Sequence, residues 1–261
     1  MAATARPFTE HNLNAKGGHA DELPANISPA KKGLFSTGSW FARLPDILQD
    51  ELLLAGRQRH LAVGSMLFRV GDDPTGLHGL LGGELHVIGS APNGHDMLMA
   101  IHRNGDWTGF LTCIDRKAHP FSALAVVDCT IFSVSPAEVT RIFERDVATF
   151  QLLLTPELRV ARRNYRWLVE IAMRPTLQRI AERLVDLGRW THGERTGPVS
   201  PIEHVSQEAL AAATNVSRQT MNSALHELEA LGLIKTGYGR IDIIDSRGLD
   251  ALANSEPRKI C

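Results

Sequence analysis

A run near the C-terminal end of the chain, NVSRQTMNSALHELEALGLIKTGYGRIDIID at residues 215–245, combines a helix-start signal with a regular apolar spacing. Behind Ser217, apolar side chains recur at the spacing of one helix face, at Met221, Leu225 and Leu228. Serine is a favoured helix N-cap, so the spacing predicts an amphipathic helix that starts just after Ser217. We therefore expect this helix to bury its apolar face and to expose its polar face to solvent or a partner.

A second, shorter helix is predicted immediately before the first. Ser206 is its N-cap and Glu208 lies in its first turn. Asn215 stands between the two helices, and asparagine tolerates the left-handed backbone that a sharp turn requires. Two helices joined in this way form a helix-turn-helix. The segment LIKTGYGRIDII that follows predicts two short strands around Gly237-Tyr238-Gly239, a hairpin that would form a wing.

The polar face of the second helix carries residue types suited to reading DNA bases. Arginine pairs with guanine, and asparagine or glutamine with adenine, while serine contacts several bases. In a helix-turn-helix the N-terminal turn of the second helix enters the major groove. The alternative is a polar face that is merely solvated. We predict DNA contacts from Ser206, Gln207, Ser217, Arg218, Gln219, Thr220, Asn222, Ser223 and Arg240.

The charge of this module limits how it can hold a duplex. From Ser206 onward, six Lys/Arg (218, 235, 240, 247, 258, 259) face seven Asp/Glu (208, 227, 229, 242, 245, 250, 256). Phosphate contacts must therefore come from placed residues such as Arg218 and Arg240, from hydroxyl and amide groups, and from helix N-termini. One such module would bind weakly, so we expect two of them on one duplex.

A long helix in the middle of the chain offers the means of pairing. Ser135 with Pro136 predicts a helix start, and the pattern stays helical to about residue 190. We expect Pro156 near the start of the long helix and a break at Arg174-Pro175. Apolar residues separated by 4, 3, 4, 3 and 4 positions form a heptad-like seam, although an ordinary core-facing stripe would have the same pattern. The predicted dimer seam is Leu154, Leu158, Ala161, Tyr165, Leu168 and Ala172.

The N-terminal half has a different sequence pattern, in which short apolar runs alternate with glycines from about residue 64 to 134. Such runs predict a small antiparallel barrel or sandwich, and the glycine-rich GLHGLLGG within them reads as β-turns. The chain is therefore expected to be α+β. Its predicted parts are a flexible arm (1–36), a sensory β-roll (37–150), a central dimerisation helix (151–174), a winged helix-turn-helix (175–252) and a tail (253–261).

Composition excludes several classes of protein. The net charge is −1, so no global basic balance indicates nucleic acid or membrane. The three cysteines are widely spaced and form no disulfide framework, which fits a reducing compartment. The N-terminus lacks the apolar core of a signal peptide and no run suits a membrane span. We expect a cytoplasmic protein without a membrane partner. Because no P-loop, G-x-S-x-G, H-E-x-x-H or dinucleotide-binding fingerprint occurs, we do not expect an enzyme.

From about Phe41 to Asp245 the chain resembles the cAMP receptor protein/FNR (Crp/Fnr) family of bacterial regulators. The resemblance rests on GSMLFRVGD at 64–72, LHGLLGGELHV at 77–87, GDWTGFL at 105–111, FSALAV at 121–126 and VSRQTM at 216–221. It implies a homodimeric transcription factor with a cyclic-nucleotide-binding-type β-roll, a long central dimerisation helix and a C-terminal winged helix. It also implies a two-fold symmetric site on double-stranded DNA, and RNA polymerase as a partner.

The chain departs from this family where cyclic nucleotides bind. Members that bind them carry a Glu for the ribose and an Arg for the phosphate, and those positions correspond to Phe110 and Phe121 here. A phosphate facing two phenyl rings has no charge-assisted partner, and Ser122 offers only a hydroxyl. We therefore predict that cAMP is not the effector, and that the phenylalanines fill the pocket or accept an apolar or unrelated ligand. Asn164 and Tyr165 correspond to the family positions that cap this pocket.

The resemblance also bears on the recognition helix and on other sensors. The family's Arg-Glu followed by Arg appears as Arg218-Gln219 followed by Ser223, so the preferred half-site should differ. Residues 1–40 lack the cysteines of the iron–sulfur variants, so no iron–sulfur cluster is predicted. We predict no other cofactor either.

Two alternatives stay open. One is a haem, metal or small-molecule sensor of the same fold. It would draw on His78, His86, His95, His102 and His119, although no pair has zinc spacing and such histidines are usually solvated. Cys113 could be redox-active, against the alternative of a buried inert thiol. The other alternative is a scaffold whose winged helix contacts protein instead of DNA.

Overall fold

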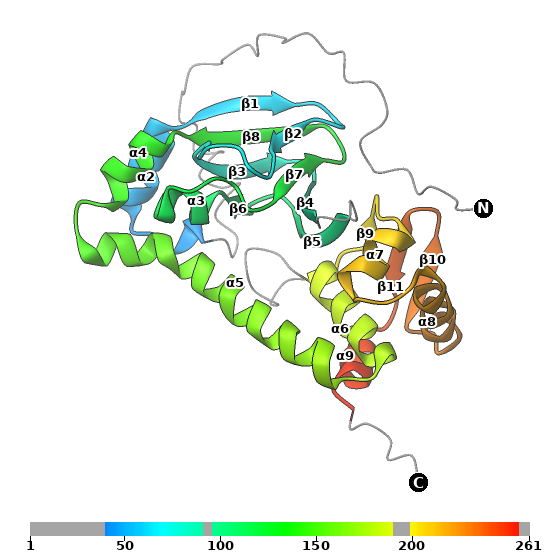
Figure 1. Cartoon of the computed structure of the whole chain (residues 1–261). Helices are drawn as coiled ribbons and strands as arrows, with labels where there is room; N and C mark the ends of the chain where they lie inside the picture. The colour runs from blue at the N-terminus through cyan, green and yellow to red at the C-terminus, as the bar shows by residue number, and fades with distance from the viewer. Residues whose placement is uncertain (1–39, 91–95, 190–198, 256–261) are drawn as a thin grey trace.

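The computed structural model describes residues 40–90, 96–189 and 199–255. The predicted N-terminal arm and the end of the predicted tail lie outside the described residues. Within them the chain forms a β-roll, a long helix and a C-terminal helical module with a small sheet (Figure 1).

The β-roll consists of two antiparallel four-stranded sheets, in the orders β1-β8-β3-β6 and β2-β7-β4-β5. Their inner faces enclose a small core of aliphatic and aromatic side chains that includes Phe68, Leu80 and Ile131. The antiparallel roll predicted from the short apolar runs is thereby confirmed. The strands are β1 (Arg57–Leu61), β2 (Met66–Phe68), β3 (Leu77–Gly82), β4 (Leu85–Ser90), β5 (Asp96–His102), β6 (Trp107–Thr108), β7 (Ser122–Ala125) and β8 (Cys129–Val134).

The prediction of turns at GLHGLLGG was wrong over most of its length. Residues Leu77–Gly82 form strand β3, and the turn begins only after them. Gly83 has φ +97°, and a Cβ at this position would lie 2.6 Å from the Asp128 carbonyl oxygen. A glycine is required there because the chain turns in a left-handed conformation against the backbone of a neighbouring strand. The glycine at position 83 therefore allows both the turn of the chain and the close approach of the neighbouring backbone.

Helices close one end of the roll. These are η1 (Phe41–Arg43), α2 (Asp46–Ala55), α3 (Phe110–Asp115) and α4 (Pro136–Phe143). They share a core with Phe132, Leu153 and a cluster of tryptophan and phenylalanine rings. Helix α4 begins as predicted, since the Ser135 hydroxyl accepts a hydrogen bond from the amide of Glu138 and Pro136 is the first helical residue.

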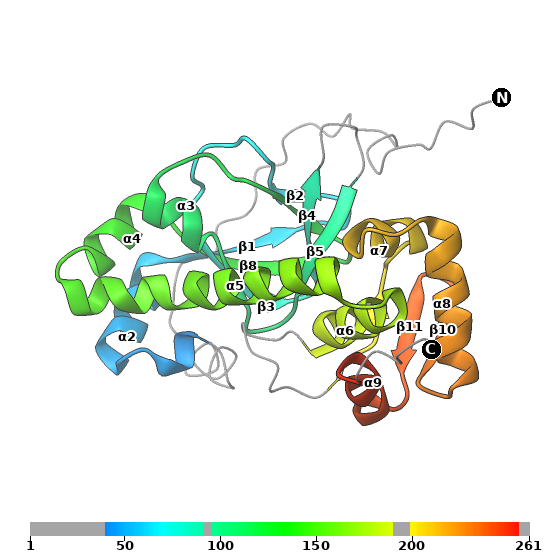
Figure 2. The ribbon, with the colours of Figure 1, turned by 60° about the horizontal axis from the view of Figure 1, so that its bottom comes forward.

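The long helix α5 (Val147–Met173) runs from α4 toward the C-terminal module, below the roll in Figure 1 and in front of its strands in Figure 2. It begins four residues before the expected position 151 and ends before Pro175, as predicted. Pro156 lies inside the helix, which corrects the expectation that it stands near the start. A proline lacks the amide that would bond the carbonyl four residues back. The indole Nε1 of Trp40 donates to that Leu152 carbonyl instead, at 2.7 Å.

The C-terminal module consists of α6 (Thr176–Arg189), β9 (Ile202–Glu203), α7 (Gln207–Ala213), α8 (Arg218–Ala230), β10 (Ile234–Gly237), β11 (Arg240–Ile243) and α9 (Ser246–Ala253). Its three strands form an antiparallel sheet in the order β10-β11-β9. The core of this module includes two residues of the β-roll, Leu98 and Ile101 on β5, which pack with Ile180, Leu184 and Leu210.

Candidate nucleic-acid interface

Helices α7 and α8 form the predicted helix-turn-helix, and both caps are the predicted serines. The Ser206 hydroxyl accepts from the amide of Ala209 at 3.0 Å. The Ser217 hydroxyl accepts from the amide of Thr220 at 3.0 Å. Asn215 has φ +53°, so the turn uses the left-handed conformation that asparagine tolerates. Local sequence therefore accounts for where both helices begin and how the chain turns between them.

Helix α8 divides into a buried and an exposed face. Met221, Leu225 and Leu228 are buried in the module's core, as the spacing predicts. The side we call the recognition face is exposed and comprises Arg218, Gln219, Asn222 and Ser223. Gln207 on α7 reaches this face, where its Nε2 donates to Asn222 Oδ1 at 3.2 Å. Thr220 and His226, at the edges, are exposed as well.

The wing is present, but its arginine is already engaged. Strands β10 and β11 meet at the Gly237-Tyr238-Gly239 tip, as predicted. The Arg240 guanidinium donates to Asp242 from Nε at 2.9 Å and also pairs with Glu203. Two carboxylates thus offset the cation that we expected to contact phosphate. A phosphate would have to displace them, so we omit Arg240 from the proposed interface.

The predicted seam on α5 lies largely on the surface of the single chain. Leu158, Tyr165 and Leu168 are 57%, 69% and 59% exposed. Ala172 is exposed too, while Leu154 and Ala161 are half-buried. Val169 and Met173 extend this apolar exposure toward the end of the helix.

The residues of the predicted effector pocket do not form one cluster. Phe110 begins α3 and packs in the helical core, with its ring centroid 4.8 Å from that of Trp40. Phe121 is half-buried and packs against the core of the roll, with its ring centroid 6.0 Å from that of Phe68. The Ser122 hydroxyl accepts from the amide of Val70 at 3.0 Å. On α5, Asn164 is half-buried and Tyr165 is exposed.

Three of the predicted histidines, His78, His86 and His119, are buried and bonded, which corrects the expectation of solvated side chains at these positions. His78 lies between Ser133 and Thr75, with its Nδ1 2.8 Å from Ser133 Oγ and its Nε2 2.9 Å from Thr75 Oγ1. His119 stacks on Phe68 at 3.8 Å between ring centroids. His86 contacts Glu84 through Nε2 at 3.1 Å. His102 is also enclosed, and burial lowers its pKa.

No metal centre is indicated in the part of the chain that the structure describes. Over these ranges, which leave out His95, no three His, Cys, Asp or Glu side chains are placed to hold an ion. Cys113 is buried on α3, and burial raises the pKa of its thiol to about 12. A thiol with so high a pKa is protonated at neutral pH and therefore a poor nucleophile.

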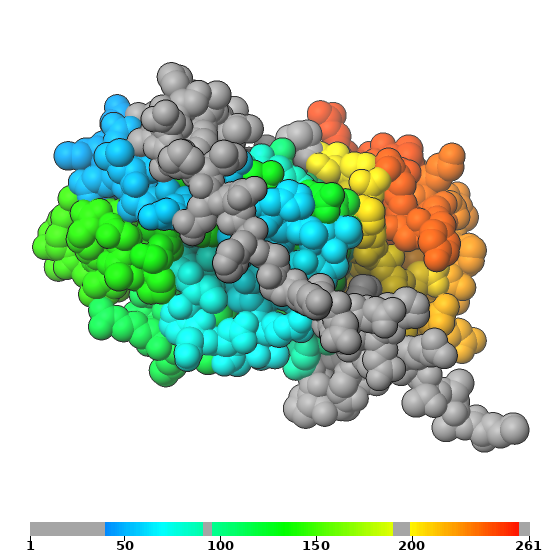
Figure 3. Space-filling view, turned by 90° about the horizontal axis from the view of Figure 1, so that it is seen from above, coloured from blue at the N-terminus to red at the C-terminus, as the bar shows by residue number. Residues whose placement is uncertain are grey.

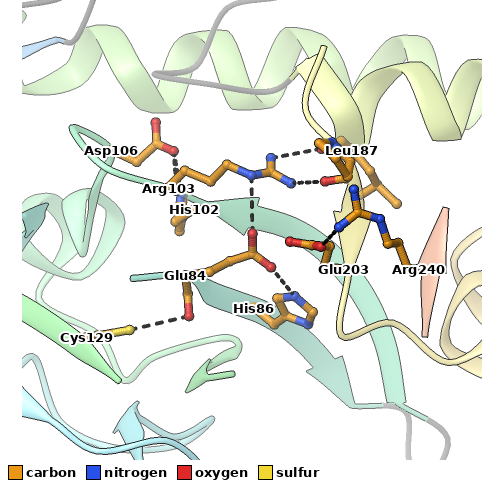
Figure 4. A network of polar contacts seen from close by, with 10 residues as sticks. Glu84, His86, His102, Arg103, Asp106, Cys129, Leu187, Glu203 and Arg240 are labelled. Atoms are coloured by element: carbon orange, nitrogen blue, oxygen red, sulfur yellow. Dashed lines mark hydrogen bonds and ion pairs between the residues drawn. The ribbon is translucent and has the colours of Figure 1, made fainter. Parts of the chain in front are cut away.

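Sequence reasoning missed the contact between the β-roll and the C-terminal module. Seen from above, the yellow-to-orange surface of the module adjoins the cyan and green surface of the roll (Figure 3). Two arginines, Arg103 after β5 and Arg183 on α6, hydrogen-bond across this contact (Figure 4 shows Arg103). The sequence feature that could have indicated this contact is Arg183, a charged residue that stands among the apolar residues of α6.

Comparisons with known proteins agree with this architecture. A family model described as "Cyclic nucleotide-binding domain" matches residues 58–146, and one described as "Crp-like helix-turn-helix domain" matches residues 178–252. The CRP-like cAMP-activated global transcriptional regulator of Mycobacterium tuberculosis is 25% identical over 71% of this chain and 83% of its own length. The cyclic AMP receptor protein of Thermus thermophilus is 24% identical over 78% of this chain and 91% of its own.

A solved structure shows the same fold. FixK2 from Bradyrhizobium japonicum superposes with a TM-score of 0.65 at 15% identity, over 77% of this chain and 99% of its own. The two matched domains and the arrangement of roll, long helix and winged helix-turn-helix define a transcriptional regulator. The chain belongs to the Crp/Fnr family. Among the described helices, none has the length and apolar character needed to span a bilayer.

Proposed function

We propose that this protein binds double-stranded DNA sequence-specifically as a homodimer, with the recognition face of α8 in the major groove. The exposed face on a serine-capped second helix is the observation that carries the proposal. In a helix-turn-helix, this is the part that contacts base edges. Arg218, in the first turn, has a guanidinium geometry that suits guanine.

Dimerisation is the second part of the proposal, and the α5 seam supports it. A contiguous apolar strip along an exposed helix is favourable only if another surface covers it. A second copy of α5 would do so and would bring two winged modules to one duplex. Because the module has nearly balanced charge, two sets of contacts are needed for useful affinity. The DNA site would then be two-fold symmetric, with half-sites about one helical turn apart. RNA polymerase is the partner that the family resemblance suggests.

We further propose that the signal is not cAMP and that no metal or other resident cofactor is needed. The M. tuberculosis relative is described as cAMP-activated. Here Phe110 and Phe121 occupy the positions for the ribose and phosphate partners, and Phe121 packs on Phe68 within the roll. An anionic phosphate in these surroundings would lose hydration without gaining a cationic partner. Calorimetric titration with cAMP should show no binding at millimolar concentration, whereas micromolar affinity would contradict this part.

The central test is selection of duplexes from a random pool by the purified full-length chain. We expect an enriched two-fold symmetric motif, with affinity that falls steeply as salt is added. Replacing Arg218 by Ala should remove about 1–3 kcal/mol of discrimination at one base pair per half-site. Arg247→Ala is the matched control, because Arg247 is an exposed arginine of the same module on α9. Failure to enrich any motif, or binding that is insensitive to salt, would instead favour a protein-binding scaffold.

A further inference from the structure

The contact between the β-roll and the C-terminal module is built around strand β5, an edge strand. In the sheet β2-β7-β4-β5 only one side of β5 is paired, with β4. An edge strand presents unpaired backbone groups and needs cover. Helices of the C-terminal module provide it, because Leu98 and Ile101 on β5 are buried in that module's core. The roll is therefore completed by a different domain of the same chain.

A β-bulge prepares β5 for this contact. Val87 on β4 pairs with Ala100 and Ile88 pairs with Leu98, so Met99 has no partner across the ladder. In a regular strand, successive carbonyls point to opposite edges, and a bulge breaks that alternation. The carbonyls of Leu98 and Met99 consequently both accept from Nη2 of Arg183, at 2.5 and 2.8 Å.

Arg183 joins three elements of the fold. It projects from α6, donates to β5, and has its guanidinium carbon 5.8 Å from the ring centroid of Trp167 on α5. The residue is buried, and a buried cation is strongly destabilising unless its donors find acceptors. Its Nη2 hydrogen bonds exist only while β5 remains in contact, although the nearby Asp186 also favours its charge.

Arg103 makes the reciprocal contact, from the roll to the C-terminal module. From the roll, it donates to the carbonyls of Leu187 at 3.2 Å and Pro201 at 3.0 Å (Figure 4). Leu187 lies in the last turn of α6, where carbonyls lack a partner within the helix and attract cations. Glu84 holds the arginine in place, with its carboxylate 3.2 Å from Arg103 Nε.

We propose that these two arginines form a clasp that fixes the winged helix-turn-helix against the β-roll of its own chain. Each domain supplies one guanidinium to backbone carbonyls of the other domain. In the clasped arrangement the recognition face is exposed, and we propose that this is the orientation that meets DNA. The effect on DNA rests on the function proposed above, whereas the effect on domain contact does not.

The first measurement is hydrogen exchange on the intact chain. Arg103→Met should speed exchange of the β5 and α7 amides at least tenfold, while the amides of β1 and β8 stay protected. The matched control is Arg116→Met, which breaks a pair with Glu144 (2.7 Å) at the C-terminal ends of α3 and α4 without touching the other domain. Unchanged exchange in β5 and α7 of a folded Arg103→Met chain would overturn the clasp.

Arg183→Met is the second variant and should have the larger effect, because Arg183 is the more deeply buried of the two. If the α6 and α8 amides of this variant also exchange rapidly, its C-terminal module is unfolded. The exchange of Arg103→Met then decides alone whether the clasp exists. Arg103→Lys keeps the charge but lacks the two-pronged donor, so exchange between that of the wild type and Arg103→Met is expected.

The second measurement is affinity for the selected duplex. If release leaves about one chain in ten in the clasped orientation, apparent affinity falls about tenfold in Arg103→Met and stays unchanged in Arg116→Met. Faster exchange with unchanged or higher affinity would overturn the role of the clasp in DNA binding. If no chain, wild type included, binds any duplex, the proposed function fails, and the exchange data still decide whether the clasp exists.

Discussion

His78 shows, at the scale of a residue, how burial fixes an ionisation state in this fold. The ring is enclosed in the roll between Thr75 and Ser133. Burial, followed by the nearby Arg59 and His119, lowers the pKa of His78 from 6.5 to about 3. The imidazole is therefore neutral in the folded chain at any pH above about 3, whereas in the unfolded chain it gains a proton below about 6.5.

Because the unfolded chain binds the proton more readily, His78 should lower stability in acid. The contribution of the neutral His78 to the free energy of unfolding is fully present above about pH 6.5. It is lost at about 1.4 kcal/mol per pH unit as the pH falls toward 3. In urea unfolding at pH 7 and pH 5, His78→Asn should lose less stability on acidification than the wild type. His60→Asn, at an exposed histidine on β1, is the control and should behave like the wild type. Equal acid sensitivity of both variants would count against a buried neutral His78.

Among single residues, those that act locally were the predictable ones. Ser135, Ser206, Ser217 and Asn215 have the predicted roles because a cap or turn depends on neighbours within a few positions. The predicted phosphate contact of Arg240 stays a prediction, and its pairing with Glu203 was not expected because Glu203 lies 37 positions away. The backbone carbonyls that Arg103 and Arg183 contact in the other domain lie 84 to 98 positions away, so no local pattern identifies them.

Helix α5 is the informative case at the scale of elements. Its extent follows from the Asp146 cap, whose side chain accepts from the amide of Thr149, and from the break before Pro175. Sequence patterns placed Pro156 near the start because an interior proline removes a hydrogen bond and costs about 3 kcal/mol. The helix continues past it, and the indole of Trp40 donates to the carbonyl that the proline leaves open.

The replacement of a missing amide by an indole can be tested by a double-mutant cycle. Trp40→Phe removes the donor and some core volume, whereas Pro156→Ala restores the amide that bonds Leu152. We expect Trp40→Phe to cost about 1 kcal/mol less in the Pro156→Ala background than in the wild type, since only the hydrogen bond differs between the two. Urea unfolding of the four proteins measures this coupling. A coupling near zero would mean that the indole bond contributes nothing to the helix.

The glycine-rich segment before Glu84 shows the limit of element prediction. Glycines at 76, 79, 82 and 83 indicated turns, yet two of them lie within β3. Gly76 and Gly83 have left-handed backbone, so part of the signal was correct. Sequence alone does not distinguish a glycine that turns the chain from one that lets another strand approach, because the second role depends on tertiary contact.

At the scale of the whole molecule, the proposed dimer can be tested on α5. Replacing Leu158 and Leu168 together by Asp should give a monomer in light scattering after size-exclusion chromatography, because four buried carboxylates would face one another across the seam. Specific DNA affinity should fall with the loss of the second module. Val63→Asp with Val70→Asp is the matched control, since both valines are exposed on the roll, near β2. An unchanged dimer peak in the α5 variant would place the interface elsewhere.

The overall architecture was predictable because its parts are marked by changes of periodicity along the chain. The glycine-punctuated runs, the 3-4 spacing and the capped helix pair gave the roll, the central helix and the winged module in order. The contact between the roll and the winged module could not be predicted from the sequence. That meeting depends on a bulge at Met99 and on one helix end, neither of which has a compositional signature.

The shared edge at β5 also bears on what happens if the chain is cut between α5 and α6. A fragment that ends near Arg174 would keep both sheets, but the outer rim of β5 would lose its cover and the apolar side chains of Leu98 and Ile101 would face water. Such a rim is a template on which another fragment can add its own strand. Proteolysis at this joint would therefore yield a fragment that tends to self-associate through β5, whereas in the intact chain the C-terminal module covers that edge.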